Sequence, residues 1–276
     1  MATGSLSPEP AIRPSLLRRP GSCRGYAGLM QLVVLGSNGT YPTAGRPASG
    51  YLVSTFDTTL WLDAGPGTYL SLCGEMDPRD LSGVFLSHRH PDHCTDVFAL
   101  YHALAYGDRR VPPIPVLCPE GLADHLGKLV GGSSAWRSVF DFVTLATGET
   151  FPLGSMEIAV VRTNHPPPTL APRITSAGRS FTYTADTGPC EELESHASGT
   201  DLLLAEASLG SPRTSDSFPH HMTGSEAGSM ACRAGVRRLM LTHIAPYVDP
   251  QRTVMEAESE FDGTVSIAVP GARVSV

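Results

Sequence analysis

The chain has 276 residues, 41% of them hydrophobic and 17% charged, which is enough for one large domain or two small ones with a buried core. No apolar run approaches the roughly 20 residues that a bilayer-spanning helix needs, so we expect no membrane partner. The six cysteines are scattered without a C-x-x-C pair. This pattern predicts reduced thiols in a cytoplasmic protein rather than a disulfide scaffold.

The first 29 residues differ in composition from the rest of the chain. They hold four arginines (Arg13, Arg18, Arg19 and Arg24) but only one acid, Glu9. We therefore expect a disordered extension at 1–29 and a single domain at 30–276. Without the extension, 16 basic and 26 acidic residues remain, a net charge near −10. Such an acidic body is a poor general binder of polyphosphate backbones, so a nucleic acid is the less expected partner.

The first half of the body reads as a β-meander followed by alternating strands and helices. Apolar runs at 30–35, 51–53 and 60–62 predict the three strands of the meander. The run at 84–86 is a further strand, and helical spacing of apolar residues predicts a helix over 95–106, with Gly107 at its end. A short strand at 114–117 and a helix at 122–130 follow.

The second half repeats this order of elements. Its predicted strands and hairpin are at 157–161, 173–175, 180–184, 202–204 and 236–242. A helix over 223–234 is the best marked element, because Thr223 and Glu226 form a T-x-x-E capping box and Gly235 follows its end. No linker separates the halves. We therefore predict one α/β domain with two strand-rich halves and outer helices.

Residues 88–93 read His-Arg-His-Pro-Asp-His and carry the strongest chemical signal in the chain. Imidazole nitrogen and carboxylate oxygen suit Zn²⁺ and neighbouring divalent ions. Alternation along an extended loop would aim His88 and His90 at one point, and Asp92 and His93 at a second. Three further polar residues, His165, Asp186 and His243, each follow a predicted strand. Strand ends converge on one rim, so the sequence predicts a shared metal site there.

The order of these residues resembles the metallo-β-lactamase-fold hydrolases, and the match runs from Met30 to His243. It includes the Asp63-Ala64-Gly65 turn and the segments at 184–188 and 205–207. The resemblance implies a four-layer αβ/βα sandwich with two divalent metal ions. Zn²⁺ is the expected metal, and Mn²⁺ or Fe²⁺ are the alternatives. Carried over by position, the implied ligands are His88, His90 and His165 for the first ion, Asp92, His93 and His243 for the second, and Asp186 as the bridge.

Within these hydrolases, the stretch from His221 to Ala227 resembles the branch of ribonuclease Z and small cyclic-nucleotide phosphodiesterases. The resemblance implies that His221 assists the leaving group, and Glu206 is a candidate to orient it. Asp92 is a candidate proton acceptor for the attacking water, and Asp63 a candidate acceptor for the N–H of a ligand imidazole. Ser37 and Asn38 lie in a glycine-rich turn that is a candidate substrate loop.

The expected reaction is hydrolysis of a phosphodiester by metal-activated water. The segment between His165 and Asp186 has no room for the long arm with which ribonuclease Z grips tRNA. Together with the acidic body, this favours a small substrate such as a 3′,5′-cyclic nucleotide. A ribonuclease Z-like tRNA 3′-end endonuclease and a glyoxalase II-like thioesterase remain alternatives. A non-catalytic metal-binding module is less favoured because every ligand is retained, and the resemblance also allows a homodimer.

Overall fold

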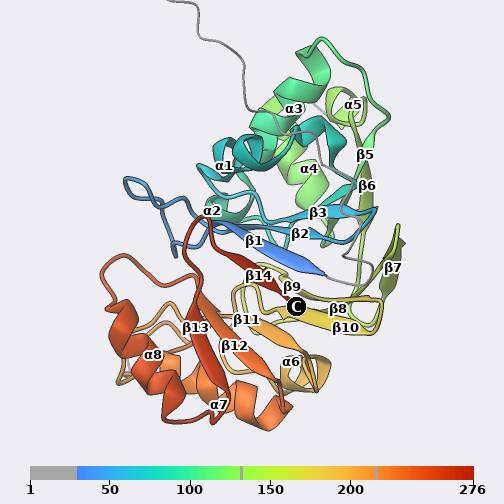
Figure 1. Ribbon diagram of the computed structural model, residues 1–276. Coiled ribbons are helices and arrows are strands. Elements are labelled where there is room, and N and C mark those ends of the chain that lie inside the picture. Colours follow the sequence, from blue (N-terminus) through green and yellow to red (C-terminus); the bar gives the residue numbers. More distant parts are fainter. Residues whose placement is uncertain (1–29, 131–132, 215–216) are drawn as a thin grey trace, which may run out of the picture.

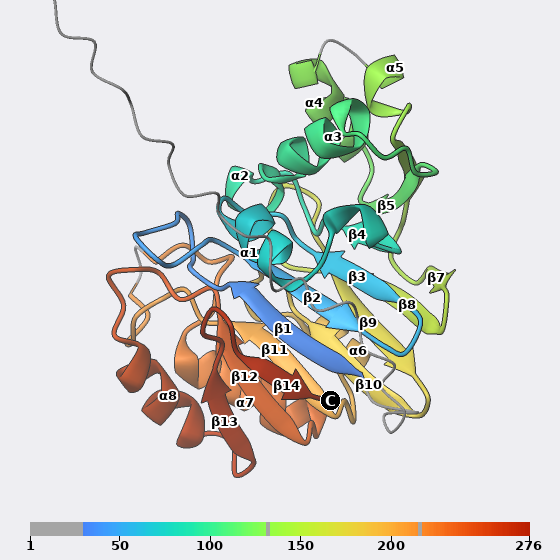
Figure 2. The same ribbon diagram turned by 45° about the horizontal axis from the view of Figure 1, so that its top comes forward.

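Two β-sheets face each other in the computed structural model, which describes residues 30–130, 133–214 and 217–276 (Figures 1 and 2). The predicted extension at 1–29 lies outside the described residues. No helix in these described ranges combines the length and apolarity that crossing a bilayer demands.

The first sheet begins as the expected meander. β1, β2 and β3 are antiparallel, whereas β3 to β6 are parallel, and β14 pairs with β1 on the outer edge. In spatial order, the strands are β14 (Arg273–Ser275), β1 (Gln31–Gly36), β2 (Gly50–Ser54), β3 (Thr59–Leu62), β4 (Gly83–Phe85), β5 (Ile114–Cys118) and β6 (Phe140–Thr144).

The second sheet has the same plan, an antiparallel part followed by a parallel part. β7 to β10 are antiparallel, and β10 to β13 are parallel. In spatial order, the strands are β13 (Thr264–Ile267), β12 (Arg238–Thr242), β11 (Leu202–Glu206), β10 (Arg179–Tyr183), β9 (Leu170–Ser176), β8 (Met156–Arg162) and β7 (Thr150–Leu153). β11 is buried at all five positions, as expected for a strand covered on both faces.

Helices cover the outer face of each sheet and complete four layers (Figure 1). The first sheet is flanked by α1 (Thr68–Glu75), α2 (Pro91–Cys94), α3 (Val97–Tyr106), α4 (Leu122–Gly127) and α5 (Ser133–Trp136), with single 3₁₀ turns at Pro78–Asp80 and Lys128–Val130. The second sheet is flanked by α6 (Glu191–His196), α7 (Gly224–Ala234) and α8 (Pro250–Glu258). One apolar core lies between the sheets, and one lies beneath each helical layer.

Most predicted elements are present, with local corrections. The helix expected over 95–106 is α3, which begins at Val97, and a separate short helix, α2, precedes it. Gly107 follows α3 with an extended backbone (φ −67°) rather than a left-handed one. The capping box of α7 is complete, because the side chains of Thr223 and Glu226 each accept from the other residue's backbone N–H. Gly235 is left-handed (φ 61°), as expected after a helix.

Candidate metal centre

The histidine-rich string spans two elements. His88 and His90 lie in the loop after β4, whereas Asp92 and His93 lie on α2 rather than on the extended loop expected from the sequence. Pro91 explains the difference, because its fixed φ favours the first position of a helix. The helical turn still separates the two pairs of side chains.

Sharp backbone turns follow three of the strands that lead into the site. Asp63 after β3, Ala185 after β10 and His243 after β12 all have left-handed φ angles, of 54°, 50° and 52°. Each such conformation costs on the order of 1 kcal/mol or more for a residue with a side chain, and persists only where surrounding contacts impose it. These turns bend the chain over the sheet edge, where His165 and Asp186 also lie after their strands.

The structure brings the seven expected ligand residues into two adjacent groups. One group contains His88, His90, His165 and Asp186, and the other contains Asp92, His93 and His243. Within each group, one potential ligand atom per residue lies within 4.8 Å of the others. The division is the one that the resemblance implies for two metal ions.

Asp186 lies between the groups and presents a different oxygen to each. Oδ2 is 3.7 Å from His88 Nε2 and 3.8 Å from His165 Nε2. Oδ1 is 3.2 Å from His93 Nε2 and 3.5 Å from His243 Nε2. A carboxylate with one oxygen toward each set of imidazoles has the geometry of a bridging ligand.

Several of these buried atoms have no hydrogen-bond partner among the described residues: His88 Nε2, His165 Nε2 and Asp186 Oδ1. His93 Nε2 and His243 Nε2 also face each other at 3.2 Å. Buried polar atoms are normally paired, because desolvation without a partner is costly. Divalent cations would satisfy these converging lone pairs, so the donor set fits two metal ions.

The charge state of the histidines is consistent with metal binding. Burial lowers the pKa of His165 to about 3 and that of His88 well below its usual value, so both rings are neutral and can donate a lone pair. Burial acts in the same direction on His93. However, the carboxylates of Asp186, Asp92 and Asp63 outweigh it and raise the pKa of His93 well above the usual value. A cation bound here would replace that proton.

Asp63 is fully buried and accepts hydrogen bonds from several parts of the fold. His93 Nδ1 lies 2.7 Å from its Oδ2, which matches the contact expected for an imidazole N–H. Ser87 donates to the same carboxylate through its backbone N–H (2.7 Å) and its hydroxyl (2.8 Å), and its hydroxyl also lies 3.0 Å from His88 Nδ1. Tyr183 Oη donates to Oδ2 at 2.9 Å. Ser87 and Tyr183 were not identified from the sequence.

Glu206 forms a similar network in the second half. His221 Nδ1 is 2.8 Å from its Oε1, the contact expected from the sequence, and the backbone N–H of Thr187 donates to the same oxygen at 2.6 Å. Ser208 donates its hydroxyl to Oε2 at 2.7 Å and also lies 2.7 Å from His243 Nδ1. In both halves, then, a buried carboxylate contacts one histidine directly and a second through serine. The spacing Glu-x-Ser is the only sequence signal for Ser208.

The predicted substrate loop lies beside His243, but its two named side chains are engaged elsewhere. Ser37 donates to the carbonyl of Ala268, and Asn38 donates to Tyr41 and Thr43 within the loop. The backbone N–H of Thr40 faces the site instead, 3.4 Å from His243 Nε2. The contact of this loop with His243 is therefore made by its backbone rather than by Ser37 or Asn38.

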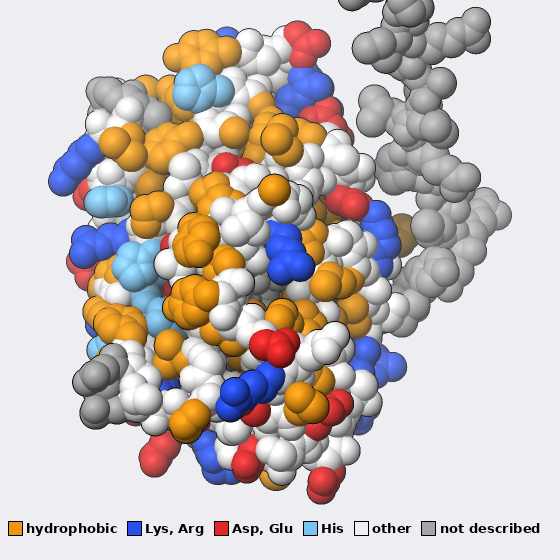
Figure 3. Space-filling model, turned by 90° about the vertical axis from the view of Figure 1, so that its left-hand side faces the viewer, with side chains coloured by type: hydrophobic (Ala, Val, Ile, Leu, Met, Phe, Trp, Pro, Cys, Tyr) orange, Lys and Arg blue, Asp and Glu red, His pale blue; other side chains and the backbone are white. Residues whose placement is uncertain are grey.

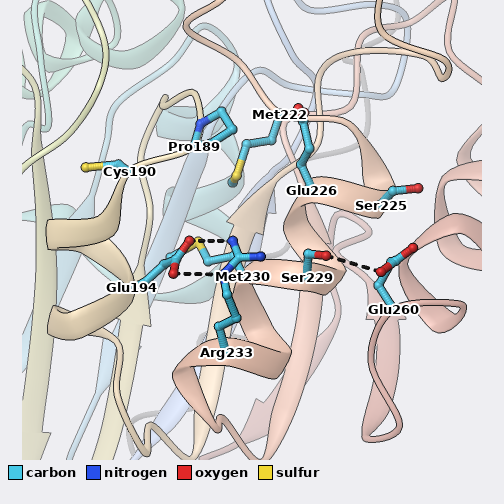
Figure 4. A pocket seen from close by; sticks show the side chains of 10 residues that line it. All are labelled: Pro189, Cys190, Glu194, Met222, Ser225, Glu226, Ser229, Met230, Arg233 and Glu260. Carbon is cyan, nitrogen blue, oxygen red and sulfur yellow. Dashed lines mark hydrogen bonds and ion pairs between the residues drawn. The ribbon is translucent and has the colours of Figure 1, made fainter.

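Within the histidine cluster, His90 and His221 are half-buried. Figure 3 shows histidine side chains next to hydrophobic ones near one margin of the face that it presents. A separate cavity of about 300 Å³ lies against α7, with Pro189 and Met222 in its wall. Its charged side chains already have partners, since Arg233 pairs with Glu194 and Ser229 donates to Glu260 (Figure 4). The unpartnered buried atoms of His88, His165 and Asp186 thus lie in the histidine cluster and not in this cavity.

Comparisons with known proteins agree with this fold. The family model of the beta-lactamase superfamily domain matches residues 58–244. An uncharacterized protein of Mycobacterium leprae is 36% identical over 93% of this chain and 92% of its own length. A ribonuclease Z of Salinispora arenicola is 28% identical over 86% of this chain and 93% of its own length.

The probable metallo-hydrolase YhfI of Bacillus subtilis is similar in both sequence and structure. It is 28% identical over 88% of this chain and 98% of its own length. Its crystal structure, a metallo-beta-lactamase fold protein, superposes with a TM-score of 0.82 over 90% of this chain and all of that chain. The two proteins thus share one fold. The chain belongs to the beta-lactamase superfamily and has the metallo-β-lactamase fold.

Proposed function

We propose that this protein is a dinuclear-metal hydrolase that cleaves a small phosphodiester, with a 3′,5′-cyclic nucleotide as the best candidate. The observation that carries the proposal is the position of Asp186, with one carboxylate oxygen toward each group of histidines. His88, His90 and His165 would hold one ion, and Asp92, His93 and His243 the other. When bound, two divalent cations, Zn²⁺ or else Mn²⁺ or Fe²⁺, supply Lewis acidity and lower the pKa of water.

Asp92 is the proposed acceptor of the proton from the attacking water. Its Oδ2 lies 3.3 Å from His243 Nε2 and 3.6 Å from His93 Nε2. Burial opposes ionisation of Asp92, but the two histidines outweigh it and lower the pKa of its carboxyl group. The carboxylate is therefore ionised at neutral pH and ready to accept a proton.

His221 is the proposed donor of a proton to the leaving alkoxide. Burial favours its neutral form, but the Glu206 carboxylate outweighs burial and raises the pKa of His221 to about 9. The imidazole is then protonated at neutral pH. Its position beside Asp186 and His243 supports this role. A protonated imidazole there would lower the barrier to departure of an alkoxide.

The size and charge of the protein favour a small substrate. β9 and β10 are joined through a tight turn at Ala177 and Gly178, which leaves no arm between His165 and Asp186. The excess of acidic residues, 27 against 20 basic ones, disfavours a long polyanion. Similarity to proteins named ribonuclease Z favours a second candidate, tRNA 3′-end cleavage.

A turnover panel on the metal-loaded protein tests these candidates. It contains 3′,5′-cyclic nucleotides, a precursor tRNA, bis(p-nitrophenyl) phosphate and a glutathione thioester. We expect hydrolysis of the cyclic nucleotides and of the activated diester. Trimming of the tRNA alone would replace the proposal with the nuclease, and cleavage of the thioester alone would replace it with a thioesterase.

A further inference from the structure

Two buried tyrosines, one on each sheet, form hydrogen bonds with residues of the opposite sheet. Tyr51 lies on β2 of the first sheet and Tyr183 on β10 of the second, and both are fully buried. Their ring centroids are 5.1 Å apart, with the planes at 60°. Tyr51 Oη hydrogen-bonds with Thr242 Oγ1 on β12 at 2.5 Å, whereas Tyr183 Oη donates to Asp63 Oδ2 after β3 at 2.9 Å.

The partner of Tyr183 is the carboxylate that contacts His93. Asp63 Oδ2 lies within 2.7 to 2.9 Å of His93 Nδ1, Ser87 Oγ and Tyr183 Oη. His93 and Ser87 follow strands of the first sheet. Among the hydrogen bonds to Asp63 in the described residues, Tyr183 alone comes from the second sheet. Asp63 therefore depends on the opposite sheet for one of its contacts.

Tyr183 is suited to act as a permanent donor. Burial, together with the nearby charge of Asp63, raises the pKa of Tyr183 well above its usual value, so the phenol keeps its proton. A buried carboxylate that loses a donor is left with uncompensated desolvation and can rotate toward its remaining partners. Rotation of Asp63 would turn the His93 ring, because a ligand histidine is oriented by the acceptor at its other nitrogen.

We propose that Tyr183 is a positioning residue, whose O–H holds the Asp63 carboxylate from the opposite sheet and thereby keeps His93 oriented for metal binding. This inference rests on the proposed metal centre. Tyr51 makes the same kind of sheet-to-sheet contact, but with a neutral hydroxyl. It is therefore a matched control for loss of a buried phenolic O–H.

The test compares Tyr183→Phe with Tyr51→Phe in the full chain. Phenylalanine keeps the ring volume, and urea unfolding of both metal-free variants reports the structural cost. Zn²⁺ affinity is then measured by competition with a chromophoric chelator, and Co²⁺-loaded protein is examined by visible absorption. We expect the second Zn²⁺ to bind about 10-fold more weakly in Tyr183→Phe, with a changed Co²⁺ spectrum, and within about twofold of the wild type in Tyr51→Phe.

Two results would overturn the role of Tyr183: an unchanged Zn²⁺ affinity in Tyr183→Phe, or equal losses of affinity in both variants. Asp63→Asn removes the carboxylate that contacts His93 and serves as the reference variant. It should weaken Zn²⁺ binding at least as much as Tyr183→Phe does. A wild-type protein that binds no Zn²⁺ would instead overturn the proposed metal centre itself. The wild-type titration therefore separates the two failures.

Discussion

At the scale of single residues, the Asp186 carboxylate lies between the two groups of histidines, and two further buried acids contact histidines of the site. Asp63 contacts His93, and Glu206 contacts His221. Buried carboxylates of this kind fix both the tautomer and the direction of the imidazole. Substitutions of the proposed metal ligands should therefore have different effects from substitutions of His221 and the carboxylate that contacts it.

Replacing Asp186 should reduce metal content as well as activity. Asp186→Ala removes both oxygens that face the histidines, so we expect loss of at least one of two bound ions, measured by elemental analysis after gel filtration. Asp141→Ala, on the exposed side of β6, is the control and should retain both ions. Full occupancy in Asp186→Ala would show that Asp186 is not a ligand.

Loss of the His221 imidazole should depend on the leaving group. We expect His221→Ala to reduce turnover of a cyclic nucleotide by about 10²- to 10⁴-fold, while p-nitrophenyl esters, whose leaving group needs little protonation, are largely spared. His220→Ala is a matched control, because His220 contacts Asn164 instead of Glu206. Equal losses on both substrates would exclude the proposed proton transfer.

The His221 imidazole should also set the alkaline limit of turnover. Because the raised pKa of His221 is about 9, its protonated form dominates at neutral pH and is lost as the pH rises through that value. Turnover of unactivated diesters should therefore fall above about pH 9. In Glu206→Gln the favourable charge is removed, so the fall should begin at lower pH. A pH–rate profile with the same alkaline limit in both proteins would contradict this assignment.

At the scale of elements, strands deliver functional residues to the sheet edge, and helices support the loops that follow. α7 begins three residues after His221, and its first turn is closed by the reciprocal contacts of Thr223 and Glu226. Arg213 extends this contact, since its guanidinium pairs with Glu226 and donates to the carbonyl of His221. The start of α7 is thus joined to the segment that carries His221.

Removing the cap should destabilise the protein measurably. Thr223→Ala deletes the oxygen that accepts from the Glu226 backbone, and we expect the free energy of unfolding to fall by about 1 kcal/mol in urea titrations. Thr223→Ser should retain most of the stability. Thr264→Ala, at the exposed start of β13, provides a control expected to change little.

The elements that could be predicted are those with a strong local pattern. Buried apolar runs predicted β1, β3, β11 and β12, and the capping box predicted α7. β13 and β14 are short and mostly half-buried or exposed, so they lack the alternation that identifies a strand. The start of α8 did carry a usable signal in Asp249 and Pro250, an N-cap followed by proline at the first helical position.

The residues of the candidate site could be predicted only where they follow an element with a strong local sequence pattern. His88, Asp186 and His243 follow recognisable strands, so the sequence could place them on one rim. Tyr183 and Ser208 act through contacts across sheets or between loops, which no local pattern encodes. The turn at Ser37 and Asn38 lies beside His243, a position that the sequence did not predict. The orientation of its side chains depended on partners such as Ala268, far along the chain.

At the scale of the whole molecule, the proposed metal centre lies between residues that follow strands of both sheets. His88 and His93 follow strands of the first sheet, whereas His165, Asp186 and His243 follow strands of the second. Ions bound between them would favour the folded state, because the ligands converge only when both sheets are in place. Stability should therefore depend on metal.

Metal removal should lower the resistance of the protein to unfolding. A ligand present at about 100 times its Kd stabilises the folded state by about 2.7 kcal/mol. We expect the urea midpoint to fall on treatment with a chelator and to recover on adding Zn²⁺. In Asp186→Ala, the chelator should have a smaller effect. An identical midpoint with and without metal in the wild type would count against ions bound between the sheets.

β14 returns from the second half to pair with β1, and this brings Val276 beside Met30. The backbone N–H of Val276 donates to the carbonyl of Met30 at 2.9 Å, and Ser275 is in register with Gln31. A short glycine–serine linker could span this gap at little entropic cost. New ends could then be opened at the exposed turn of Ala177 and Gly178. Such a circular permutant would retain every strand pairing and would make the strands of the first sheet, β14 and then β1 to β6, continuous in sequence.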